Sequence, residues 1–357
     1  MAKLVAVDAL DAGFEEHAHS LRDVLGVNTE DIPWHLVLSK KEFAEWCRRA
    51  VEHTQEVVLK FLHERYGDTF LANGEFLRGL EHARIDLNVL QGYMESEDNS
   101  TVRGTLASFV PGEDGYTETI GYSQIGTSTG RLIVKAGPQV LTLPKKYKDI
   151  IKSRYRDGKV YQVDFVALEP RVARLIAGGA IPRDIYEGIS REMFEGELTR
   201  EEVKLAVLCA LYGISVRRLK NMLGDRVRPR QIIKKIRSYF GVDQLADRLR
   251  SQLGDRGYID NFYGRRLALH DESENIMISH FLQSSAVDVA LLGFSELISE
   301  AHCAGLKLHP LFIIHDALLV DVCSSADRAF EELVATGVQL DNLGSFPLSL
   351  DVVSRST

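Results

Sequence analysis

Residues 161–179 read YQVDFVALEPRVARLIAGG, an apolar β-type run that ends on an aspartate and passes at once into a helical pattern. Asp164 stands at the end of the run, and Glu169 and Arg171 follow within the next two helical turns. Aspartate is a frequent helix N-cap, and Glu and Arg are frequent on helix surfaces. An ordinary strand–helix connection therefore explains these residues as well as a functional site does.

A second strand signal lies at residues 311–322, LFIIHDALLVDV, where His315 and Asp316 separate two apolar runs. This pattern predicts a β-hairpin with a charged tip. If the hairpin neighbours the strand that ends at Asp164, the two aspartates meet at one sheet edge and can bind divalent metal. Two Mg²⁺ ions held roughly 3.5–4 Å apart stabilise the attacking and leaving oxygens of a phosphoryl transfer. Because aspartate is common in turns, the pair alone is a weak indication.

A graded helix face is predicted at residues 200–213, REEVKLAVLCALYG. Residues at four-residue intervals share one face of a helix, over about 18 Å at about 1.5 Å per residue. This face carries Arg200, Lys204, Leu208 and Tyr212. The order from cations to an apolar side chain to a ring suits a triphosphate, a sugar and a base. An amphipathic helix with a charged first turn has the same spacing, so this alternative stays open.

The composition is that of a globular protein, with 357 residues, 45% hydrophobic and 26% charged. This length allows two or three subdomains around a substantial core. The four cysteines include no CxxC pair, so neither a disulfide framework nor a zinc site is indicated. No apolar run reaches the roughly 18 residues of a membrane span, and the first residues do not resemble a signal peptide. We therefore expect a cytoplasmic protein without a membrane partner.

Charge is distributed unevenly along the chain. The formal net charge is −8, yet residues 214–250 hold eleven Lys and Arg against three Asp, a local charge of +8. The remainder therefore sums to −16. This asymmetry predicts one basic surface on an acidic body, which suits nucleic acid. A solvated helix face explains a run of charges equally well.

Hydrophobic spacing divides the chain into helical and strand-rich parts. Residues 1–95 and 181–255 have mostly helical spacing, and a long helix is expected from about Glu274 to the early 300s. Further strand signals are TLASFV (105–110), KVYQVDF (159–165), YIDNFYGRRLAL (258–269) and FPLSLDVV (346–353). Strand-rich pieces on either side of a helical insertion predict a discontinuous α+β domain.

Six segments resemble motifs of the family A DNA polymerases, the bacterial polymerase I and T7-type group. They occur in the family's order and with similar spacing over roughly residues 75–357. The segments are DFVALEPR at 164–171 (motif A), 200–213 (motif B), His315-Asp316 (motif C), TGRL at 129–132 with Pro138 and Pro144, YGRR at 263–266, and QSSAVD at 283–288. Chance similarity is a poor explanation for six ordered matches.

The resemblance implies an α+β fold of the right-hand polymerase type, with an antiparallel palm sheet, helical fingers and a reduced helical thumb. The implied parts are residues 1–115 for the N-terminal helices and thumb, 116–180 and 270–357 for the palm, and 181–269 for the fingers. The implied activity is template-directed addition of dNTPs to the 3′ end of a primer, with primer–template DNA as the partner.

The resemblance also implies which residues carry the chemistry. Asp164, Asp316 and the carbonyl of Phe165 would hold two Mg²⁺ ions, for which Mn²⁺ can substitute. Lys204 would donate a proton to the leaving pyrophosphate. The dNTP would contact Arg200, Lys204, Leu208, Tyr212, Glu169 and Tyr186. The DNA would contact Arg131, Gln283, His315, Arg171, Arg265 and Arg266.

Several positions make these expectations more specific. Glu169 would obstruct a 2′-hydroxyl, which favours deoxyribonucleotides. Leu208 stands where the family usually has Phe or Tyr, which disfavours dideoxynucleotides. Ala317 follows Asp316 where motif C usually has Glu, and we expect activity to survive this change. Duplex contacts of the family are missing at Leu141, Thr142, Asn275 and Ser279, which predicts weak DNA binding and low processivity.

The N-terminal stretch VAVDALDAGFEE offers Asp8 and Asp11 but no Asp-x-Glu, the motif of the family's 3′–5′ exonuclease domain. We therefore expect no proofreading in this chain. A separate exonuclease or processivity factor is a compatible partner. The compact build is typical of a phage-like enzyme, which would work in the cytoplasm of its host.

Two other classes of function stay open. A single-subunit RNA polymerase or primase-like enzyme would share several motifs, but Glu169 argues against this class. A non-catalytic nucleic-acid-binding relative would keep the fold without the reaction. The retained Asp164 and Asp316 argue against a purely binding role, whereas Ala317 keeps it open.

Overall fold

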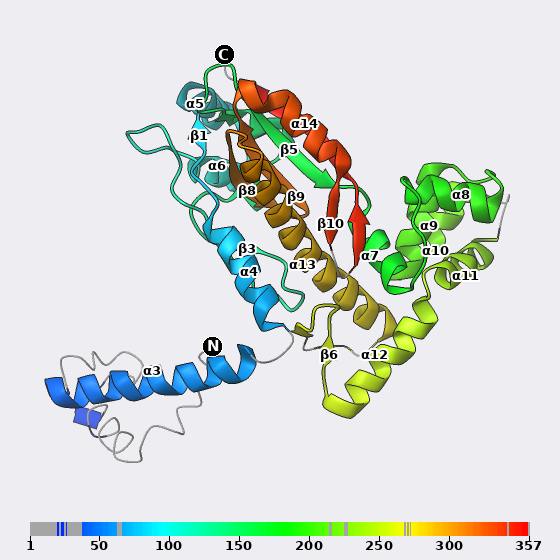
Figure 1. The fold of residues 1–357 in the computed structure, drawn as a ribbon, viewed down its shortest axis with the longest axis horizontal. Helices are drawn as coiled ribbons and strands as arrows, with labels where there is room; N and C mark the ends of the chain where they lie inside the picture. Colours follow the sequence, from blue (N-terminus) through cyan, green and yellow to red (C-terminus); the bar gives the residue numbers. More distant parts are fainter. Residues whose placement is uncertain are drawn as a thin grey trace. The chain divides into compact units, whose positions relative to one another are not determined.

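The computed structural model describes residues 20, 23–24, 26, 38–62, 66–213, 216–224, 228–267, 269, 271, 273–340 and 343–355 (Figure 1). Asp8 and Asp11, the two aspartates of the N-terminal stretch that lacks an Asp-x-Glu motif, lie outside the described residues. The chain separates into two compact units, Met1–Gly67 and Asp68–Thr357. The boundary between them falls inside residues 1–115, the segment expected to form the N-terminal helices and thumb.

The first unit contains helix α3 (Lys40–Leu62), as its helical spacing predicts. Ser39 begins the helix with a capping box: its hydroxyl oxygen accepts the N–H of Glu42, and the Glu42 carboxylate accepts the N–H of Ser39. Arg48 and Glu45 form an ion pair of 2.5 Å one turn apart on the exposed surface. Local contacts of this kind define both the start and the outer face of the helix.

The second unit is built around a four-stranded antiparallel sheet in the order β12–β5–β9–β8. Strand β5 (Lys159–Phe165) lies between β12 (Leu348–Arg355) and β9 (Ala317–Val322), and β9 also pairs with β8 (Leu308–Ile314). All four strands coincide with strand signals of the sequence. The sheet joins strands from both sides of a helical insertion, which confirms the discontinuous α+β fold.

One face of this sheet is covered by helix α13 (Glu274–Cys303), which Figure 1 shows crossing in front of the strands. The ring of Phe165 at the end of β5 lies 4.9 Å from the ring of Phe294 in this helix. Because side chains alternate along a strand, Gln162 and Asp164 point to the opposite face of the sheet. Gln162 and Asp164 therefore lie away from the packing between β5 and α13.

Helix α13 is long and apolar enough to cross a membrane by composition alone. However, 67% of its most apolar 18-residue window is buried inside the protein. Its side chains pack against the sheet and the neighbouring helices. It is therefore the core helix of the second unit.

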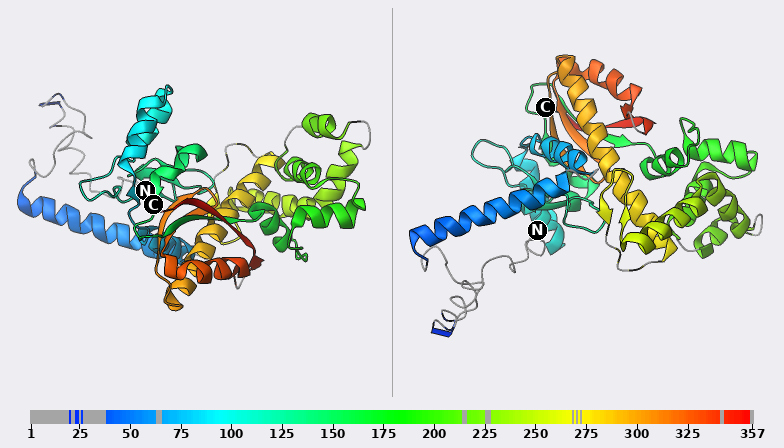
Figure 2. Two further views of the ribbon diagram at one scale, coloured as in Figure 1. Left: turned by 90° about the horizontal axis from the view of Figure 1, so that it is seen from above. Right: turned by 60° about the horizontal axis from the view of Figure 1, so that its bottom comes forward.

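The insertion between β5 and α13 is a group of helices, seen to the right of the sheet in both panels of Figure 2. The helices are α7 (Leu168–Ile176), α8 (Ile185–Phe194), α9 (Arg200–Tyr212), α10 (Val216–Leu223), α11 (Pro229–Tyr239) and α12 (Val242–Arg256). A capping box between Thr199 and Glu202 begins α9, and Gly213 ends it with a φ of 65°. The helical spacing of the sequence predicts this group correctly.

Short elements complete the second unit. The helices are α4 (Gly67–Arg78), α5 (Leu87–Ser96), α6 (Ser100–Ala107) and α14 (Asp327–Thr336), with 3₁₀ turns η3 (Val140–Thr142), η4 (Lys145–Ile150) and η5 (Ser324–Ala326). The strand pairs are β1 (Arg84–Ile85) with β4 (Ile151–Lys152), β2 (Gly121–Ser123) with β3 (Ile133–Ala136), β6 (Ile259–Asp260) with β7 (Arg266–Leu267), and β10 (Val338–Leu340) with β11 (Gly344–Phe346).

Two predictions about the early part of this unit are wrong. TLASFV (105–110) begins as the end of α6 and is not a strand, because the Asn99 side chain caps that helix by accepting two backbone N–H groups of its first turn. The helical pattern of residues 75–94 is interrupted by β1, which pairs with β4. The helix α5 then starts anew after Asp86, whose side chain accepts a backbone N–H of the first turn.

Candidate active site

The two aspartates predicted to bind metal lie at the same end of the sheet. Asp164, near the end of β5, is paired with Ala317 of β9. Asp316 and His315 form the two-residue turn between β8 and β9, where His315 has a left-handed φ of 59°. The N–H of Phe165 lies 3.5 Å from the carbonyl oxygen of Asp316. The expected contact between the strand and the hairpin tip is therefore confirmed.

The electrostatics of this end of the sheet favour a cation. Burial raises the pKa of Asp164, a hydrogen bond from Gln162 opposes the rise, and the nearby Asp316 carboxylate adds to it. Mg²⁺ takes oxygen ligands and is commonly held by one or two carboxylates, with water and substrate phosphates completing its shell. The pair of carboxylates fits this role. No group of three or more His, Cys, Asp or Glu that could hold a metal occurs in the described part of the chain.

A cavity of about 470 Å³ opens beside the hairpin tip. Its walls come from the loop before β3, from α7, α8, α9 and α13, and from the hairpin tip itself. Seven lining residues belong to the predicted site: Arg131, Glu169, Tyr186, Leu208, Gln283, His315 and Asp316. Residues far apart in the sequence therefore meet in one concave site, the shape that binding of a small molecule requires.

Glu169 is held from two sides in the first turn of α7. Its Oε1 accepts a hydrogen bond of 3.2 Å from Nη2 of Arg131, and its Oε2 accepts one from the hydroxyl of Tyr212. Burial raises the pKa of Tyr212, and the Glu169 carboxylate raises it further, so the phenol remains a donor. Just before the helix, Ala167 has a φ of 52°, a strained conformation for a residue with a Cβ.

The predicted triphosphate face of α9 is partly occupied by contacts within the protein. Arg200 donates from Nε to Oδ2 of Asp184 at 2.8 Å, and its guanidinium lies 5.4 Å from the ring centre of Tyr186. Asp184 also caps α8, so Arg200 is attached to the start of that helix. Lys204 is exposed and forms no ion pair with the residues that the structure describes. Leu208 borders the cavity.

Arg171 is placed differently from the predicted DNA contact. Its side chain is 3% exposed, and its Nε donates to the carbonyl oxygen of Val166 at 2.8 Å. Its Nη2 donates to the carbonyl oxygens of Pro182 and Arg183. Because a buried guanidinium without partners would be costly, these bonds tie the turn after β5 to the segment before α8. Arg171 therefore stabilises these two segments, which lead into α7 and α8, two of the helices that line the cavity.

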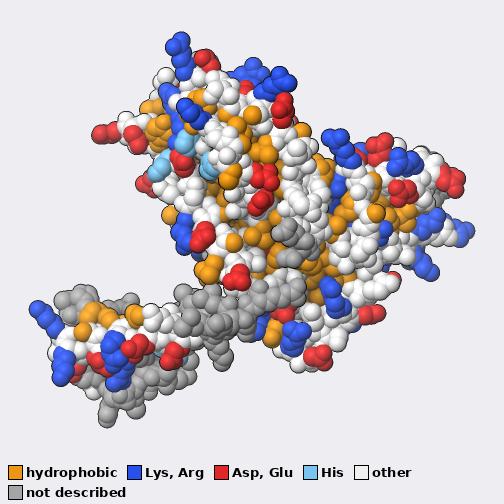
Figure 3. Space-filling model, viewed as in Figure 1, with side chains coloured by type: hydrophobic (Ala, Val, Ile, Leu, Met, Phe, Trp, Pro, Cys, Tyr) orange, Lys and Arg blue, Asp and Glu red, His pale blue; other side chains and the backbone are white. Residues whose placement is uncertain are grey.

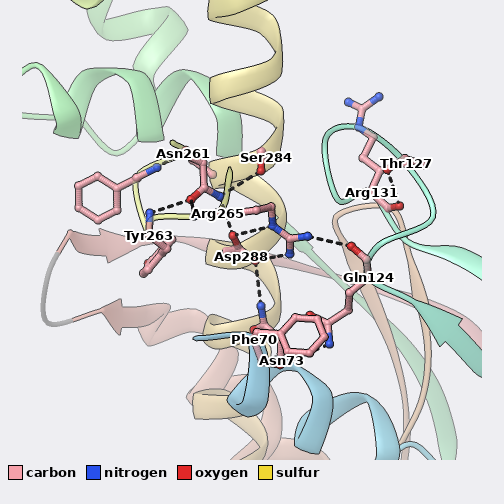
Figure 4. A network of polar contacts seen from close by, with 12 residues as sticks. Phe70, Asn73, Gln124, Thr127, Arg131, Asn261, Tyr263, Arg265, Ser284 and Asp288 are labelled. Atoms are coloured by element: carbon pink, nitrogen blue, oxygen red, sulfur yellow. Dashed lines mark hydrogen bonds and ion pairs between the residues drawn. The ribbon is translucent and has the colours of Figure 1, made fainter. Parts of the chain in front are cut away.

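Arg265 is also buried, with 6% of its surface exposed. Its guanidinium pairs with Asp288 of α13 at 2.9 Å and donates to the carbonyl oxygen of Gln124 at 2.8 Å. Asp288 also accepts hydrogen bonds from Asn73 at 2.9 Å and from Asn261 at 2.7 Å. Figure 4 shows this network, which joins four segments of the second unit. In this conformation Arg265 is occupied by protein contacts, which differs from the predicted DNA contact.

The same network supports the loop that carries Arg131. Gly130, with a φ of 76°, lies directly against the guanidinium of Arg265. The hydroxyl of Thr127 donates to the carbonyl oxygen of Arg131 at 3.0 Å, and the Arg131 side chain points away from the network (Figure 4). Arg265 therefore supports the position of Arg131 through the backbone of this loop. Arg266, the next residue, is exposed.

Two residues outside the sequence predictions hold Asp164. Gln162 donates from Nε2 to Oδ2 of Asp164 at 2.8 Å, and Lys148 of η4 donates from Nζ to Oε1 of Gln162 at 2.8 Å. Residues two apart on a strand share a face, so the sequence could have predicted that Gln162 lies beside Asp164. No pattern in the sequence predicts that Lys148 contacts Gln162.

Comparison with known proteins agrees with this geometry. The model of DNA polymerase family A matches residues 55–355. A DNA polymerase of Mycobacterium phage L5 is 27% identical over 177 residues, which cover 47% of this chain and 29% of that protein. The POL domain of Pol1 from M. smegmatis, solved in complex with DNA primer–template and dNTP, has a TM-score of 0.53 at 18% identity. That match covers 84% of this chain and 65% of that chain, and it shows a common fold.

The chain thus spans less than a third of the phage polymerase that it matches. The family model, in contrast, extends over most of the sequence and includes every segment on which the resemblance depends. The chain therefore belongs to DNA polymerase family A.

Proposed function

We propose that this chain is a template-directed DNA polymerase that adds dNTPs to the 3′ end of a primer. The observation that carries the proposal is the cavity beside the hairpin tip, because it brings together seven predicted site residues from separate segments. Membership of the family supports the same activity.

Asp164, Asp316 and the carbonyl oxygen of Phe165 would hold two metal ions. Divalent metal, when bound, supplies the positive charge that stabilises the attacking and leaving oxygens of a phosphoryl transfer. The repulsion between the two carboxylates is relieved by a cation, which favours binding. Mg²⁺ is the expected ion, and Mn²⁺ can substitute because both prefer carboxylate and water ligands.

Arg200 and Lys204 would receive the triphosphate on one face of α9. Asp184 fixes the direction of the Arg200 guanidinium, whose planar fork matches phosphate oxygens. The exposed Lys204 stands one turn further along and would donate a proton to the leaving pyrophosphate. Burial raises the pKa of Tyr186 to about 12, so its hydroxyl stays protonated and can donate a hydrogen bond to the nucleotide.

Glu169 and Leu208 would select the sugar of the nucleotide. Arg131 and Tyr212 hold the Glu169 carboxylate from two sides, so it cannot easily move away from the cavity. A fixed carboxylate next to the sugar obstructs a 2′-hydroxyl, which supports a preference for dNTPs. Leu208 offers no hydroxyl that could replace a missing 3′-hydroxyl, which supports discrimination against dideoxynucleotides.

Arg131, Gln283 and His315 would contact the minor groove of the primer–template duplex. All three line the cavity. The acceptors of the minor groove are nearly independent of sequence, so such contacts test the geometry of a base pair. The exposed Arg266 is a further proposed DNA contact, whereas the buried Arg171 and Arg265 would support the site.

The division into parts belongs to the same proposal. Residues 116–180 and 270–357 would form the palm, residues 181–269 the fingers, and residues 1–115 the N-terminal helices and thumb. The chain would work in the cytoplasm without proofreading of its own. A separate exonuclease or processivity factor is a compatible partner.

The test is extension of a labelled primer on a template strand with Mg²⁺ and either dNTPs or rNTPs. Wild-type protein should extend the primer with dNTPs and poorly with rNTPs. Asp164→Ala and Asp316→Ala should each lose several orders of magnitude in rate, because each removes a charge that holds the metal. Asp98→Ala is the matched control, because this exposed residue between α5 and α6 belongs to no part of the site.

Folded wild-type protein that binds primed DNA without extending it would contradict the proposal. That result would favour a non-catalytic binding module, for which the replacement of the usual motif C glutamate by Ala317 is the supporting observation. Equal use of rNTPs and dNTPs would contradict the selective role of Glu169.

A further inference from the structure

We infer that Gln162 and Lys148 form a two-residue arm that positions the carboxylate of Asp164 for metal binding. The inference deepens the proposed function and rests on it. Lys148 donates from Nζ to Oε1 of Gln162, and Gln162 donates from Nε2 to Oδ2 of Asp164, each over 2.8 Å. The resemblance to the family assigns a role to neither residue.

The lysine determines which way the amide of Gln162 points. An ammonium group can only donate, whereas the two ends of an amide differ, one accepting and one donating. Lys148 therefore attracts the oxygen of the amide, and the NH₂ group must face Asp164. This arrangement engages Oδ2 of the carboxylate and leaves Oδ1 free for another ligand.

Both members of the arm stand on rigid elements. Gln162 and Asp164 share the face of β5 that points away from α13, in the middle of the four-stranded sheet. Lys148 belongs to η4, which is anchored by the buried side chains of Tyr147 and Ile150. Lys148 itself is half-buried. A group that positions a catalytic residue needs such support, because small displacements at the reacting atoms are costly in rate.

The neighbouring strands do not provide this positioning. On one side of Asp164 stands Ala317, whose side chain has no polar atom. On the other side stands Ser349, whose hydroxyl lies 3.4 Å from the backbone oxygen of Asp164 and not on its carboxylate. Among the described residues, Gln162 makes the one side-chain hydrogen bond to the Asp164 carboxylate.

Gln162 acts as a spacer between Lys148 and Asp164, and its presence has a physical reason. A direct ion pair would place an ammonium group where the proposed cation must bind, and the two charges would compete. The neutral amide of Gln162 instead orients the carboxylate and keeps the lysine one side chain away. The positive charge still counteracts the repulsion between Asp164 and Asp316, because electrostatic attraction extends over such distances in a partly buried site.

The test uses Gln162→Leu, which removes both hydrogen bonds, and Lys148→Met, which releases the amide. Lys145→Met is the matched control, because it removes the same charge from an exposed position on the same 3₁₀ turn. Single-nucleotide incorporation gives kcat and the KM for dNTP. Electron paramagnetic resonance of free Mn²⁺, titrated into each protein with primer–template but without nucleotide, gives the affinity for metal independently of turnover.

We expect Gln162→Leu and Lys148→Met to lower kcat and Mn²⁺ affinity by about 10–100-fold, the usual effect of losing a partner of a metal ligand. The KM for dNTP and the affinity for primer–template should change little. Lys148→Arg keeps a donor for Gln162 and should restore most of the activity. The Lys145→Met control should resemble wild type in every measurement.

The inference is overturned if Gln162→Leu and Lys148→Met bind Mn²⁺ and extend primers as wild type does while Asp164→Ala is inactive. In that case the proposed function stands and the arm has no role. If wild-type protein itself fails to extend a primer, the proposed function fails instead. Should Gln162→Leu not fold, Lys148→Met decides together with Lys148→Arg, because the hydrogen bonds connect Lys148 to Asp164 only through Gln162.

Discussion

At the scale of single residues, Asp164, a proposed metal ligand, should destabilise the protein when no metal is bound. Burial raises its pKa, so ionising the carboxyl costs free energy in the folded state. Below the ordinary pKa of an aspartate, the folded and unfolded states both hold the proton and no cost arises. Above the raised pKa both states are ionised and the cost is complete, so the penalty grows as the pH rises between these values.

Replacement of Asp164 by Asn should therefore raise the Tm of the metal-free protein at neutral pH and leave it unchanged below about pH 3. Primer extension should fall by several orders of magnitude. Thermal unfolding at a series of pH values measures the first effect. Mg²⁺ should raise the Tm of the wild type and not that of the variant, because only a bound ligand stabilises the folded state. An Asn variant less stable than wild type at neutral pH would refute the burial argument.

Leu208 permits a test of sugar selection that does not touch the metal site. Leu208→Tyr should raise the efficiency of dideoxynucleotide incorporation relative to dNTPs by roughly 10–100-fold, because the new hydroxyl can replace the missing 3′-hydroxyl. Ratios of kcat/KM for the two substrates measure the effect. Leu208→Phe adds the ring without the hydroxyl and should leave the ratio near that of wild type. Equal gains in both variants would mean that the ring, and not the hydroxyl, matters.

The sequence predicts which residues gather at the site better than it predicts what they touch. Asp316 and Glu169 do meet at one cavity, because motifs report positions along a shared fold. Arg171 and Arg265 are buried in contacts to backbone carbonyls or to a carboxylate, and no motif distinguishes an arginine facing DNA from one facing the interior. Lys148 reaches the site through a contact between distant parts of the chain, which a single sequence does not reveal.

At the scale of elements, the loop before β3 depends on one glycine. Gly130 has a φ of 76°, and a Cβ there would lie 2.3 Å from Nη1 of Arg265. Gly130→Ala should therefore destabilise the protein by more than about 1 kcal/mol, through backbone strain and displacement of the buried Arg265. The neighbouring Arg131 should lose its alignment, so the affinity for primer–template should fall as well.

Thermal unfolding and fluorescence anisotropy with labelled primer–template check both effects. Gly92→Ala is the matched control, since a Cβ at this position in α5 would meet no atom within 4 Å beyond its chain neighbours and its own helix backbone. It should be neutral or stabilise the helix by up to about 1 kcal/mol. A Gly130→Ala protein with the Tm and DNA affinity of wild type would show that the network does not support the loop.

Elements with a long or regular apolar pattern could be predicted from the sequence, and short elements that depend on caps or distant pairing could not. Strand β5 has the predicted bounds because apolar side chains recur along it, and helix α13 has them because it is a long apolar segment that is buried on most sides. TLASFV, in contrast, has strand-like composition, but the cap at Asn99 begins a helix that continues into it. In the short β1, pairing with a strand distant in sequence overrides the helical pattern.

At the scale of the whole molecule, the uneven charge predicts how DNA binding responds to salt. Helices α10 and α11 carry exposed basic residues, and Figure 3 shows Lys and Arg along the outer margin of the helical group, with Asp and Glu among them. The exposed side chains are Arg217, Arg218, Lys220, Arg230, Lys234 and Lys235. If this surface contacts phosphates, each contact releases counterions and adds about 0.7–0.9 to the slope of log K against log salt.

A double variant, Arg217→Ala with Lys220→Ala, should therefore weaken DNA binding uniformly across sequences and reduce that slope by about 1–2. Arg328→Ala with Lys307→Ala removes the same charge from the other part of the second unit and should leave the slope unchanged. Anisotropy titrations at four or more salt concentrations measure it. A slope that is the same in both double variants would place the DNA elsewhere, and tight binding that resists salt would contradict the expected low processivity.

The order of strands in the sheet also affects when the proposed metal site can form during synthesis. Strand β5 is made before its partners on both sides, because β9 and β12 follow it in the chain. The Ser349 hydroxyl and the backbone oxygen of Asp164 that meet across the β12–β5 edge are 185 residues apart in the chain. Contacts of such long range form slowly and only after both segments exist. A nascent chain therefore holds Asp164 without Asp316 until residues 165–316 have been made. The proposed metal site cannot form before that point.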